Sequence, residues 1–273
     1  MSISTSILNK ALQSARINRG IGYDTYLFSY QSNRYVLRIE NTNIRSRLKL
    51  ERHAFILYIL KTKHYIQRVI QSGVINGRYY FVTDYIKAMS ISQLNRITFL
   101  KLQKILKDFH KTQGRNAGLI IPGHLKGEQK DWLNYIELNL QAMKRITKKS
   151  SIFKKKLDLT SRSFRNLKSQ IIKRTNTSLL HGDINRENLL NNKNKIFILD
   201  WENAQIGDPL ADYAILDNFF NNNTIILSYV QTSDVPIFCF YKSFFLLKEI
   251  YYKKKSGMPV RQDLIKLRLF NIG

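Results

Sequence analysis

The stretch that decides the fold reads Leu-Leu-His-Gly-Asp-Ile-Asn-Arg-Glu-Asn-Leu-Leu over residues 179–190, and then Ile-Phe-Ile-Leu-Asp-Trp-Glu over residues 196–202. It places polar side chains at fixed offsets between short apolar runs, namely His181, Asp183, Asn188 and Asp200. The first three have the spacing H-x-D-x-x-x-x-N, and the last ends a short hydrophobic strand. A carboxylate can act as a general base, and carboxylate and amide oxygens are ligands that Mg²⁺ accepts. The pattern therefore indicates a base beside a divalent-cation site.

This stretch resembles the aminoglycoside phosphotransferase / choline kinase superfamily, the small-molecule branch of the kinase-like fold. The resemblance rests on residues 179–190 and on residues 198–214, which read Ile-Leu-Asp-Trp-Glu-Asn-Ala-Gln-Ile-Gly-Asp-Pro-Leu-Ala-Asp-Tyr-Ala. Within it, Asp-Trp-Glu at 200–202 is similar to the pattern of bacterial choline, ethanolamine and thiamine kinases. The resemblance implies a protein-kinase-like two-lobed fold, with ATP in the cleft and a small hydroxyl compound as acceptor.

Departures from protein kinases narrow the class further. Gly182 stands where many protein kinases have an arginine, and Asp-Trp-Glu replaces D-F-G. Asp208-Pro209 follows Asp200 closely, with no A-P-E motif, so there is no room for a regulatory activation loop. A protein kinase is therefore disfavoured. Asp208 and Asp212 are expected to brace the catalytic loop and cap a helix rather than to do chemistry.

The resemblance assigns roles to the motif residues. Asp183 is expected to be the base that orients and deprotonates the acceptor hydroxyl, and Asn188 and Asp200 are expected to hold Mg²⁺. His181 is expected to be a scaffold that positions the loop by hydrogen bonds. Glu202 is expected either to supplement the metal site or to face the acceptor.

Nucleotide-binding residues are expected earlier in the chain. Arg38 ends the strand Tyr-Val-Leu-Arg, where the family has a cation that pairs with phosphate, and a guanidinium offers phosphate a bidentate fork. Glu51, on the following helix, is the expected partner of Arg38. Gly20 and Gly22 give G-x-G, whose backbone N–H groups could cover the phosphates. Because the third glycine is missing, a plain β-turn explains the same residues nearly as well.

The periodicity along the chain predicts an α+β protein in two parts. Strand patterns dominate at first, with a helical pattern only from about Ile44 to Lys61, and Asn76-Gly77 between Val69–Ile75 and Tyr79–Tyr85 predicts a type I′ hairpin. From Phe99 onward helical patterns dominate, with Phe99, Leu102, Leu106 and Phe109 on one face.

These patterns predict a β-rich nucleotide-binding lobe over residues 1–88 and a mainly helical catalytic and acceptor-binding lobe over residues 89–273. The backbone of Asp84 and Ile86, where the lobes would join, is expected to face adenine.

Charge is the most unusual feature of the composition. The chain has 45 Lys and Arg against 19 Asp and Glu, a formal net charge of +26. Much of the excess falls between Lys144 and Arg174, where low glycine and proline content predicts a helix with a solvated basic face. Weak contact with an anionic membrane or another polyanion through this stretch is left open, and no specific nucleic acid is expected.

The chain contains one cysteine, Cys239, so it cannot form an internal disulfide, which fits a reducing compartment and a cytoplasmic location. The apolar run Pro236–Leu247 carries Lys242 and is too short to span a membrane, so it is expected to be a core helix.

These observations favour an ATP-dependent kinase that acts on choline, ethanolamine or thiamine. An antibiotic phosphotransferase acting on an aminoglycoside or a macrolide is the alternative, because it needs the same base and metal ligands. A non-catalytic, basic polyanion-binding protein with a kinase-like fold is a further alternative. The sequence leaves open the acceptor, the choice between ATP and GTP, and the oligomeric state.

Overall fold

The structure is a computed structural model that describes residues 3–14, 16–19, 23–41, 44–145, 151–174, 177–193, 195–220 and 223–269. The chain divides into two compact units. Unit 1 comprises Met1–Ser92, Ile120–Leu125 and Arg186–Ala204, and unit 2 comprises Gln93–Leu119, Lys126–Asn185 and Gln205–Gly273. The first segment of unit 1 ends close to the boundary predicted near residue 88. Two later segments also belong to unit 1, and one of them carries Asn188 and Asp200.

Unit 1 is built on a five-stranded antiparallel sheet with the order β1-β2-β3-β5-β4. Its strands are β1 (Arg16–Arg19), β2 (Tyr23–Tyr30), β3 (Asn33–Glu40), β4 (Val69–Ile75) and β5 (Arg78–Asp84). The hairpin predicted from Asn76-Gly77 joins β4 to β5. Both turn residues have positive φ, 51° at Asn76 and 75° at Gly77, as a type I′ turn requires. The turn prediction is confirmed.

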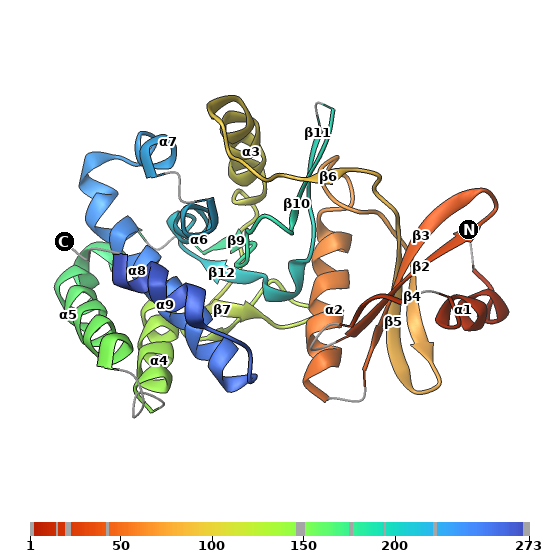
Figure 1. The fold of residues 1–273 in the computed structure, drawn as a ribbon, viewed down its shortest axis with the longest axis horizontal. Coiled ribbons are helices and arrows are strands. Elements are labelled where there is room, and N and C mark those ends of the chain that lie inside the picture. The colour runs from red at the N-terminus through yellow and green to blue at the C-terminus, as the bar shows by residue number, and fades with distance from the viewer. Residues whose placement is uncertain are drawn as a thin grey trace. The chain divides into compact units, whose positions relative to one another are not determined.

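Two helices cover opposite faces of this sheet, α1 (Thr5–Leu12) and α2 (Ile44–Ile59) (Figure 1). Successive side chains of a strand point to opposite faces. In β3, Leu37 and Ile39 join the apolar core that contains residues of α1. Arg38, between them, turns to the other face, where Phe81 of β5 meets His53 of α2 with ring centroids 4.9 Å apart. The alternation thus places a buried cation on the α2 side of the sheet.

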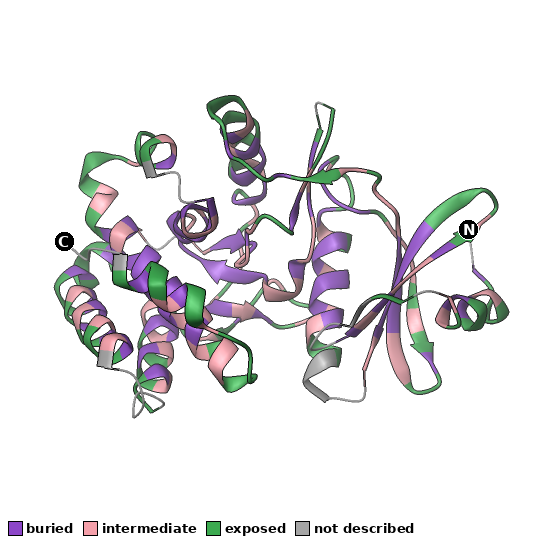
Figure 2. Cartoon of the chain, in the orientation of Figure 1, coloured by how far each residue is buried: buried purple, intermediate pink, exposed green. Residues whose placement is uncertain are grey.

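A smaller antiparallel sheet completes unit 1, with the order β11-β10-β6. It consists of β6 (Met89–Ser90), β10 (Leu189–Asn192) and β11 (Lys195–Ile198), and a short 3₁₀ helix, η2 (Trp201–Asn203), follows it and packs against α2. The described residues where β10 ends and β11 begins are exposed, whereas the opposite end of the hairpin is buried at Leu189 and Ile198 (Figure 2).

Unit 2 combines a four-stranded sheet with most of the helices. The sheet has the order β8-β7-β12-β9, with β7 (Ala117–Ile120), β8 (Gly127–Gln129), β9 (Ser178–Leu180) and β12 (Gln205–Gly207). The helices are α3 (Arg96–Phe109), α4 (Trp132–Lys144), α5 (Ser151–Arg174), α6 (Leu210–Phe220), α7 (Asn223–Leu227), α8 (Val235–Lys255) and α9 (Arg261–Leu269), and the 3₁₀ helix η3 (Thr232–Asp234) precedes α8. The predicted α+β class, β-rich first and mainly helical later, is confirmed.

Helix α8 is the centre of the helical core in unit 2. It packs against α6, α5, α4 and α9, and its middle part, residues 240–247, is buried around the whole circumference. This agrees with the core helix predicted from Pro236–Leu247. The predicted apolar face of α3 is likewise buried, at Phe99, Leu102, Leu106 and Phe109. Among the described residues, no helix combines the length and the apolar character that a membrane crossing needs.

The basic stretch between Lys144 and Arg174 is described from residue 151 onward, as α5. Apolar residues at intervals of three and four are buried in this helix, including Phe153, Leu157, Phe164 and Ile171. Most of its lysines and arginines are exposed. Arg174 differs, because its guanidinium forms ion pairs with Asp208 and Asp234. Most of the charge thus lies on a solvated helix face, as predicted.

Candidate active site

Asn188 and Asp200 lie at the same end of the β10–β11 hairpin. Strand pairing places Leu189 opposite Ile198, and the Leu199 N–H donates to the Asn188 carbonyl oxygen at 2.8 Å. Asp200 is the next residue, and it adopts a left-handed conformation with φ 61° and ψ 68°. An amide side chain and a carboxylate side chain thus belong to the same end of one hairpin in unit 1.

The Asp200 carboxylate accepts a hydrogen bond from an aromatic hydroxyl, and an imidazole lies near it. Tyr23 Oη donates to Asp200 Oδ1 at 2.8 Å, and His53 Nδ1 lies 3.5 Å from the same oxygen. Burial, together with the charges of Asp200 and Glu202, raises the pKa of Tyr23 well above its ordinary value. Tyr23 therefore remains a neutral hydrogen-bond donor, and it fixes the orientation of Asp200.

The donors at the hairpin end, one amide and one carboxylate, are of the kinds that Mg²⁺ accepts. Within the described parts of the chain, no three His, Cys, Asp or Glu side chains group as a metal site would require. Mg²⁺ is commonly bound by one or two carboxylates, with phosphate oxygens and water in the other positions. Asn188 and Asp200 match that requirement.

Glu202 lies in the same unit as Asp200 but is already paired. Its Oε1 lies 2.7 Å from Lys49 Nζ, and its backbone carbonyl accepts from Arg52 at 2.8 Å. Burial, followed by the charge of Asp200, raises the pKa of Glu202, and Lys49 and Arg52 oppose that shift. The two roles predicted for Glu202, beside the metal and toward the acceptor, both stay predictions.

Arg38 is buried without the predicted acidic partner. Its guanidinium donates to Gln67 Oε1 at 3.1 Å and to Thr83 Oγ1 at 3.3 Å, and Glu51 instead pairs with Arg47, one helical turn away, at 2.8 Å. The predicted Arg38–Glu51 pair is therefore wrong. Glu51 pairs with Arg47 because an arginine and a glutamate four residues apart on one helix pair readily. No local sequence pattern predicts that Gln67 contacts Arg38.

The structure describes only some of the other residues that were predicted to bind the nucleotide. Gly20 and Gly22 lie outside the described residues. The Asp84 carbonyl accepts from the Gln67 side chain at 3.0 Å, and its N–H donates to the Arg68 carbonyl at 3.2 Å. Both backbone groups of Asp84 thus have partners in the protein. The predicted contact with adenine stays a prediction. Because both backbone groups of Asp84 already have partners, the backbone of Ile86 is the better candidate for that contact.

The loop that contains Asp183 belongs to unit 2, and a buried carboxylate anchors it. Asp212 on α6 accepts from the backbone N–H groups of His181 and Gly182, each at 2.9 Å, and its Oδ2 lies 2.9 Å from His110 Nε2. Gly182 has φ 77°, a conformation that glycine adopts without strain. The bracing role predicted for Asp212 is confirmed.

Asp183 itself is partly exposed on this anchored loop. Its backbone N–H donates to His181 Nδ1 at 3.2 Å, and its Oδ1 accepts from the Asn185 side chain at 3.1 Å. Because Nδ1 of His181 accepts, that nitrogen carries no proton. The fully buried His181 therefore orients the loop, which supports the predicted scaffold role.

A lysine that the sequence reasoning missed lies in the same unit as Asp183. Lys248 on α8 donates from Nζ to the Tyr135 hydroxyl, and Nζ lies 5.1, 5.4 and 5.9 Å from the ring centroids of Tyr135, Phe245 and Tyr252. Burial lowers the pKa of Lys248, whereas Tyr252 and the charge of Asp183 raise it. In the sequence, Lys248 is distinguished only by its position directly after the apolar run Pro236–Leu247.

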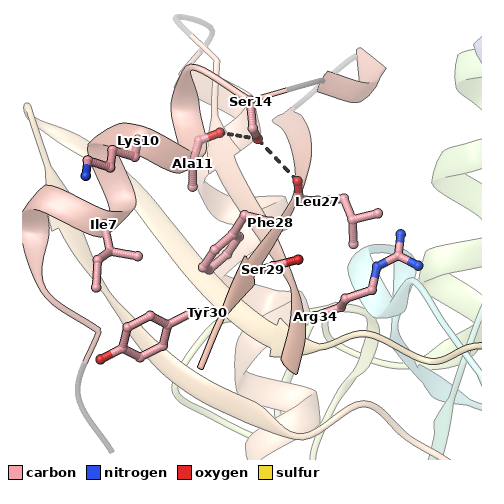
Figure 3. A pocket seen from close by; sticks show the side chains of 9 residues that line it. All are labelled: Ile7, Lys10, Ala11, Ser14, Leu27, Phe28, Ser29, Tyr30 and Arg34. Atoms are coloured by element: carbon pink, nitrogen blue, oxygen red, sulfur yellow. Dashed lines mark hydrogen bonds between the residues drawn. The ribbon is translucent and has the colours of Figure 1, made fainter. Parts of the chain in front are cut away.

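The hollow in Figure 3 lies elsewhere in unit 1, where α1 packs on β2. It has a volume of about 540 Å³ and is lined by Ile7, Lys10, Ala11, Ser14, Leu27, Phe28, Ser29, Tyr30 and Arg34. Ser14 Oγ bridges its two sides by donating to the carbonyl oxygens of Ala11 and Leu27. None of the predicted site residues lines this hollow.

Comparison with known families decides the class of the protein. The model of the phosphotransferase enzyme family matches residues 14–226, which include every predicted site residue. The chain belongs to this family. Membership confirms the predicted enzyme class, an ATP-dependent phosphotransferase of small molecules. A comparison with curated proteins finds no match.

Solved structures of this phosphotransferase's neighbours share its fold at low sequence identity. A thermostable mutant of aminoglycoside phosphotransferase APH(4)-Ia, in a ternary complex with AMP-PNP and hygromycin B, is 14% identical with a TM-score of 0.74, and the match covers 96% of this chain and 94% of that one. Choline kinase LicA from Streptococcus pneumoniae is 15% identical with a TM-score of 0.68, covering 96% and 95%. Spectinomycin phosphotransferase APH(9)-Ia is 13% identical with a TM-score of 0.64, covering 99% and 94%. The kinase-like fold is confirmed.

Proposed function

We propose that this phosphotransferase moves the γ-phosphate of Mg·ATP to a hydroxyl of a small molecule, with Asp183 as the base and Asn188 and Asp200 as the magnesium ligands. One observation carries the proposal. Asn188 and Asp200 share one hairpin end, where Tyr23 donates to Asp200. The buried Arg38, which has no acidic partner among the described residues, lowers the pKa of the same Tyr23. A buried guanidinium of this kind is suited to an anionic ligand such as a nucleotide phosphate.

In the proposed reaction, the acceptor hydroxyl gives its proton to the Asp183 carboxylate. The acceptor oxygen forms a bond to the γ-phosphorus while the bond from that phosphorus to the β,γ-bridging oxygen breaks, so that ADP leaves. Bound Mg²⁺ supplies neutralisation of phosphate charge. Arg38 orients phosphate oxygens, and the Asp212 anchor keeps Asp183 in place on its loop.

The acceptor class expected from the sequence is an amino-alcohol such as choline or ethanolamine, or thiamine. It is supported by the Asp-Trp-Glu pattern at 200–202 and by the short interval before Asp208, which has no segment for docking a peptide. Aminoglycosides and macrolides remain the alternative, and likeness to APH(4)-Ia and APH(9)-Ia speaks for the fold alone. The single Cys239 supports a cytoplasmic location.

Two substitutions test the assignment of base and metal ligand. Asp183→Asn should lower kcat by at least about 10³-fold, and it should leave stabilisation by Mg·ATP largely intact, because the base acts in the transition state. Asp200→Asn should abolish both turnover and the Mg·ATP-dependent rise in the melting temperature. Thermal unfolding with and without nucleotide, together with ADP release over a panel of hydroxyl acceptors, measures both effects.

The matched control is Asp158→Asn, which removes an exposed carboxylate from the solvated side of α5. It should match the wild type in both measurements. If the two active-site phenotypes are exchanged, the roles of Asp183 and Asp200 have been assigned the wrong way round. If the folded wild type gains no stability at millimolar Mg·ATP, the proposed function itself is wrong.

A further inference from the structure

Lys248 lies in the same unit as the proposed base Asp183, and the charge of Asp183 raises the pKa of this lysine. It belongs to α8, and Tyr135, which accepts its hydrogen bond, belongs to α4, so the packing of these helices brings the two together. Of the described carboxylates, none lies within ion-pair distance of Lys248, whereas the nearby Lys242 and Lys253 of the same helix both have acidic partners. Among the described residues, the Lys248 ammonium thus has a hydroxyl and aromatic rings around it but no ion-pair partner.

The surroundings of Lys248 would suit a cationic ligand if the lysine were absent. Faces of aromatic rings attract ammonium groups, and aromatic cages bind quaternary ammonium ligands on this basis. Here the faces of Tyr135, Phe245 and Tyr252 surround the Nζ of the protein's own lysine. A second ammonium at this position would meet a like charge at short range in a partly desolvated place, which is costly.

An acceptor with an anionic group would instead be attracted by the Lys248 ammonium. Burial disfavours the charged form of Lys248, while the charge of Asp183 favours it. An isolated, partly buried ammonium gains most from a ligand that brings a carboxylate or phosphate oxygen, because charge-assisted hydrogen bonds are the strong ones. Tyr135 fixes the ammonium by accepting one of its three hydrogen-bond donors, so donors remain for a ligand.

Resting on the proposed function, we propose that Lys248 binds the acceptor, and that the natural acceptor is a hydroxyl compound carrying a carboxylate or phosphate group rather than a simple amino-alcohol. Lys248 would pair with the anionic group while Asp183 takes the proton of the hydroxyl. The inference replaces the cationic acceptor expected from the sequence with one of the opposite charge, and it leaves the roles of Asp183, Asn188 and Asp200 unchanged.

Matched acceptors test the charge preference directly. Ethanolamine, ethylene glycol and glycolate share a two-carbon hydroxyl skeleton, and glucosamine, glucose, glucuronate and glucose 6-phosphate share a sugar ring. Binding of each compound to the protein saturated with Mg·ADP is measured by calorimetry, and phosphorylation is measured by ADP release from Mg·ATP. Within at least one series the anionic members should bind more tightly than the neutral and cationic ones, and comparing glucuronate with glucose 6-phosphate distinguishes carboxylate from phosphate.

Substitution of the lysine should remove that preference. Lys248→Met should weaken binding of the preferred anion, or raise its KM, by about 10- to 100-fold while changing the KM for ATP little, and Lys248→Arg should restore much of the loss. Lys254→Met is the matched control, because Lys254 lies on the same helix over a single ring, that of Phe153, at 5.3 Å. It should keep the wild-type preference.

Several results would overturn the inference. The cationic members could bind more tightly or be phosphorylated faster than the anionic ones, or no anionic member could bind. The preference for anionic acceptors could also be unchanged in Lys248→Met. An equal fall in kcat for all acceptors and for water in Lys248→Met would also overturn it, because Lys248 would then serve the transferred phosphoryl group. Stabilisation of the wild type by Mg·ATP separates these failures from a failure of the proposed function, since that stabilisation does not depend on the acceptor.

Discussion

At the scale of single residues, the acidic side chains near the predicted site residues differ in the partners that each one contacts. Asp212 accepts from the N–H groups of His181 and Gly182, contacts His110 and holds a loop, whereas Asp183 is partly exposed and accepts from the Asn185 side chain. Glu202 shares unit 1 with Asp200 and is neutralised by Lys49. Proximity in the sequence would not have distinguished these roles, because all of these acids lie within a short stretch of chain.

Glu202→Gln tests the side of the reaction on which Glu202 acts. Glutamine cannot neutralise Lys49, so the charge balance beside Asp200 changes, and we expect kcat or the Mg²⁺ dependence to change by about tenfold while the acceptor KM stays within about twofold. Steady-state kinetics with ATP, Mg²⁺ and the acceptor varied in turn measure this. Glu137→Gln, at an exposed position of α4, is the control. A rise confined to the acceptor KM would instead place Glu202 at the acceptor.

At the scale of elements, one buried ion pair joins the two helices at the centre of unit 2. Asp217 on α6 pairs with Lys242 on α8, and their side chains are 0% and 8% exposed. Burial raises the pKa of Asp217, and Lys242 opposes the shift. A buried pair adds little net stability, but a single remaining partner is strongly unfavourable. The α6–α8 contact therefore depends on keeping both residues or neither.

Lys242→Met should lower the free energy of unfolding by about 3–5 kcal/mol at neutral pH, because it leaves the Asp217 carboxylate buried and unpaired. In the variant the pKa of Asp217 in the folded state rises further above its unfolded value. Stability should therefore decrease as the pH rises between these two values, so the variant should be more stable at pH 5 than at pH 8 relative to the wild type. Urea unfolding followed by circular dichroism at both pH values measures this difference. The double variant Lys242→Met/Asp217→Asn should regain part of the loss, and no regain would contradict the explanation.

At the scale of the whole molecule, the net charge of +26 calls for a physical account. On α5 most basic side chains lie on a solvated face, whereas Arg174 forms ion pairs with Asp208 and Asp234. A positive surface attracts polyanions without sequence preference, and such binding weakens steeply as salt is added. The same surface would also favour the approach of an anionic acceptor over a cationic one, which agrees with the role proposed for Lys248.

Salt dependence separates nonspecific polyanion binding from catalysis. We expect any affinity for duplex DNA to fall by roughly 10³-fold or more between 50 and 200 mM salt, as counterion release predicts for six or more phosphate contacts. Stabilisation by Mg·ATP should persist over the same range. Fluorescence anisotropy with labelled DNA and thermal unfolding with nucleotide measure the two. Tight DNA binding at 200 mM salt without any stabilisation by Mg·ATP would instead support the non-catalytic alternative.

The sequence by itself determined the class of fold, the turn chemistry and the residues of the motif. Asn76-Gly77 specified its turn because positive φ at two successive positions is a local property, and the apolar spacing in α3 specified its buried face for the same reason. The spacing of His181, Asp183, Asn188 and Asp200 indicated the family because the chemistry needs those groups at those offsets.

Only the tertiary structure decided which distant side chains meet. Arg38 meets Gln67 rather than Glu51, and Lys248 meets Tyr135 across 113 residues of chain. Helical and strand periods specify which face of an element is buried, but they do not specify which polar group of another element will face it. The partners of buried charges follow from the packing of elements that are remote in sequence. In this protein the proposed choice of acceptor depends on one such charge, that of Lys248.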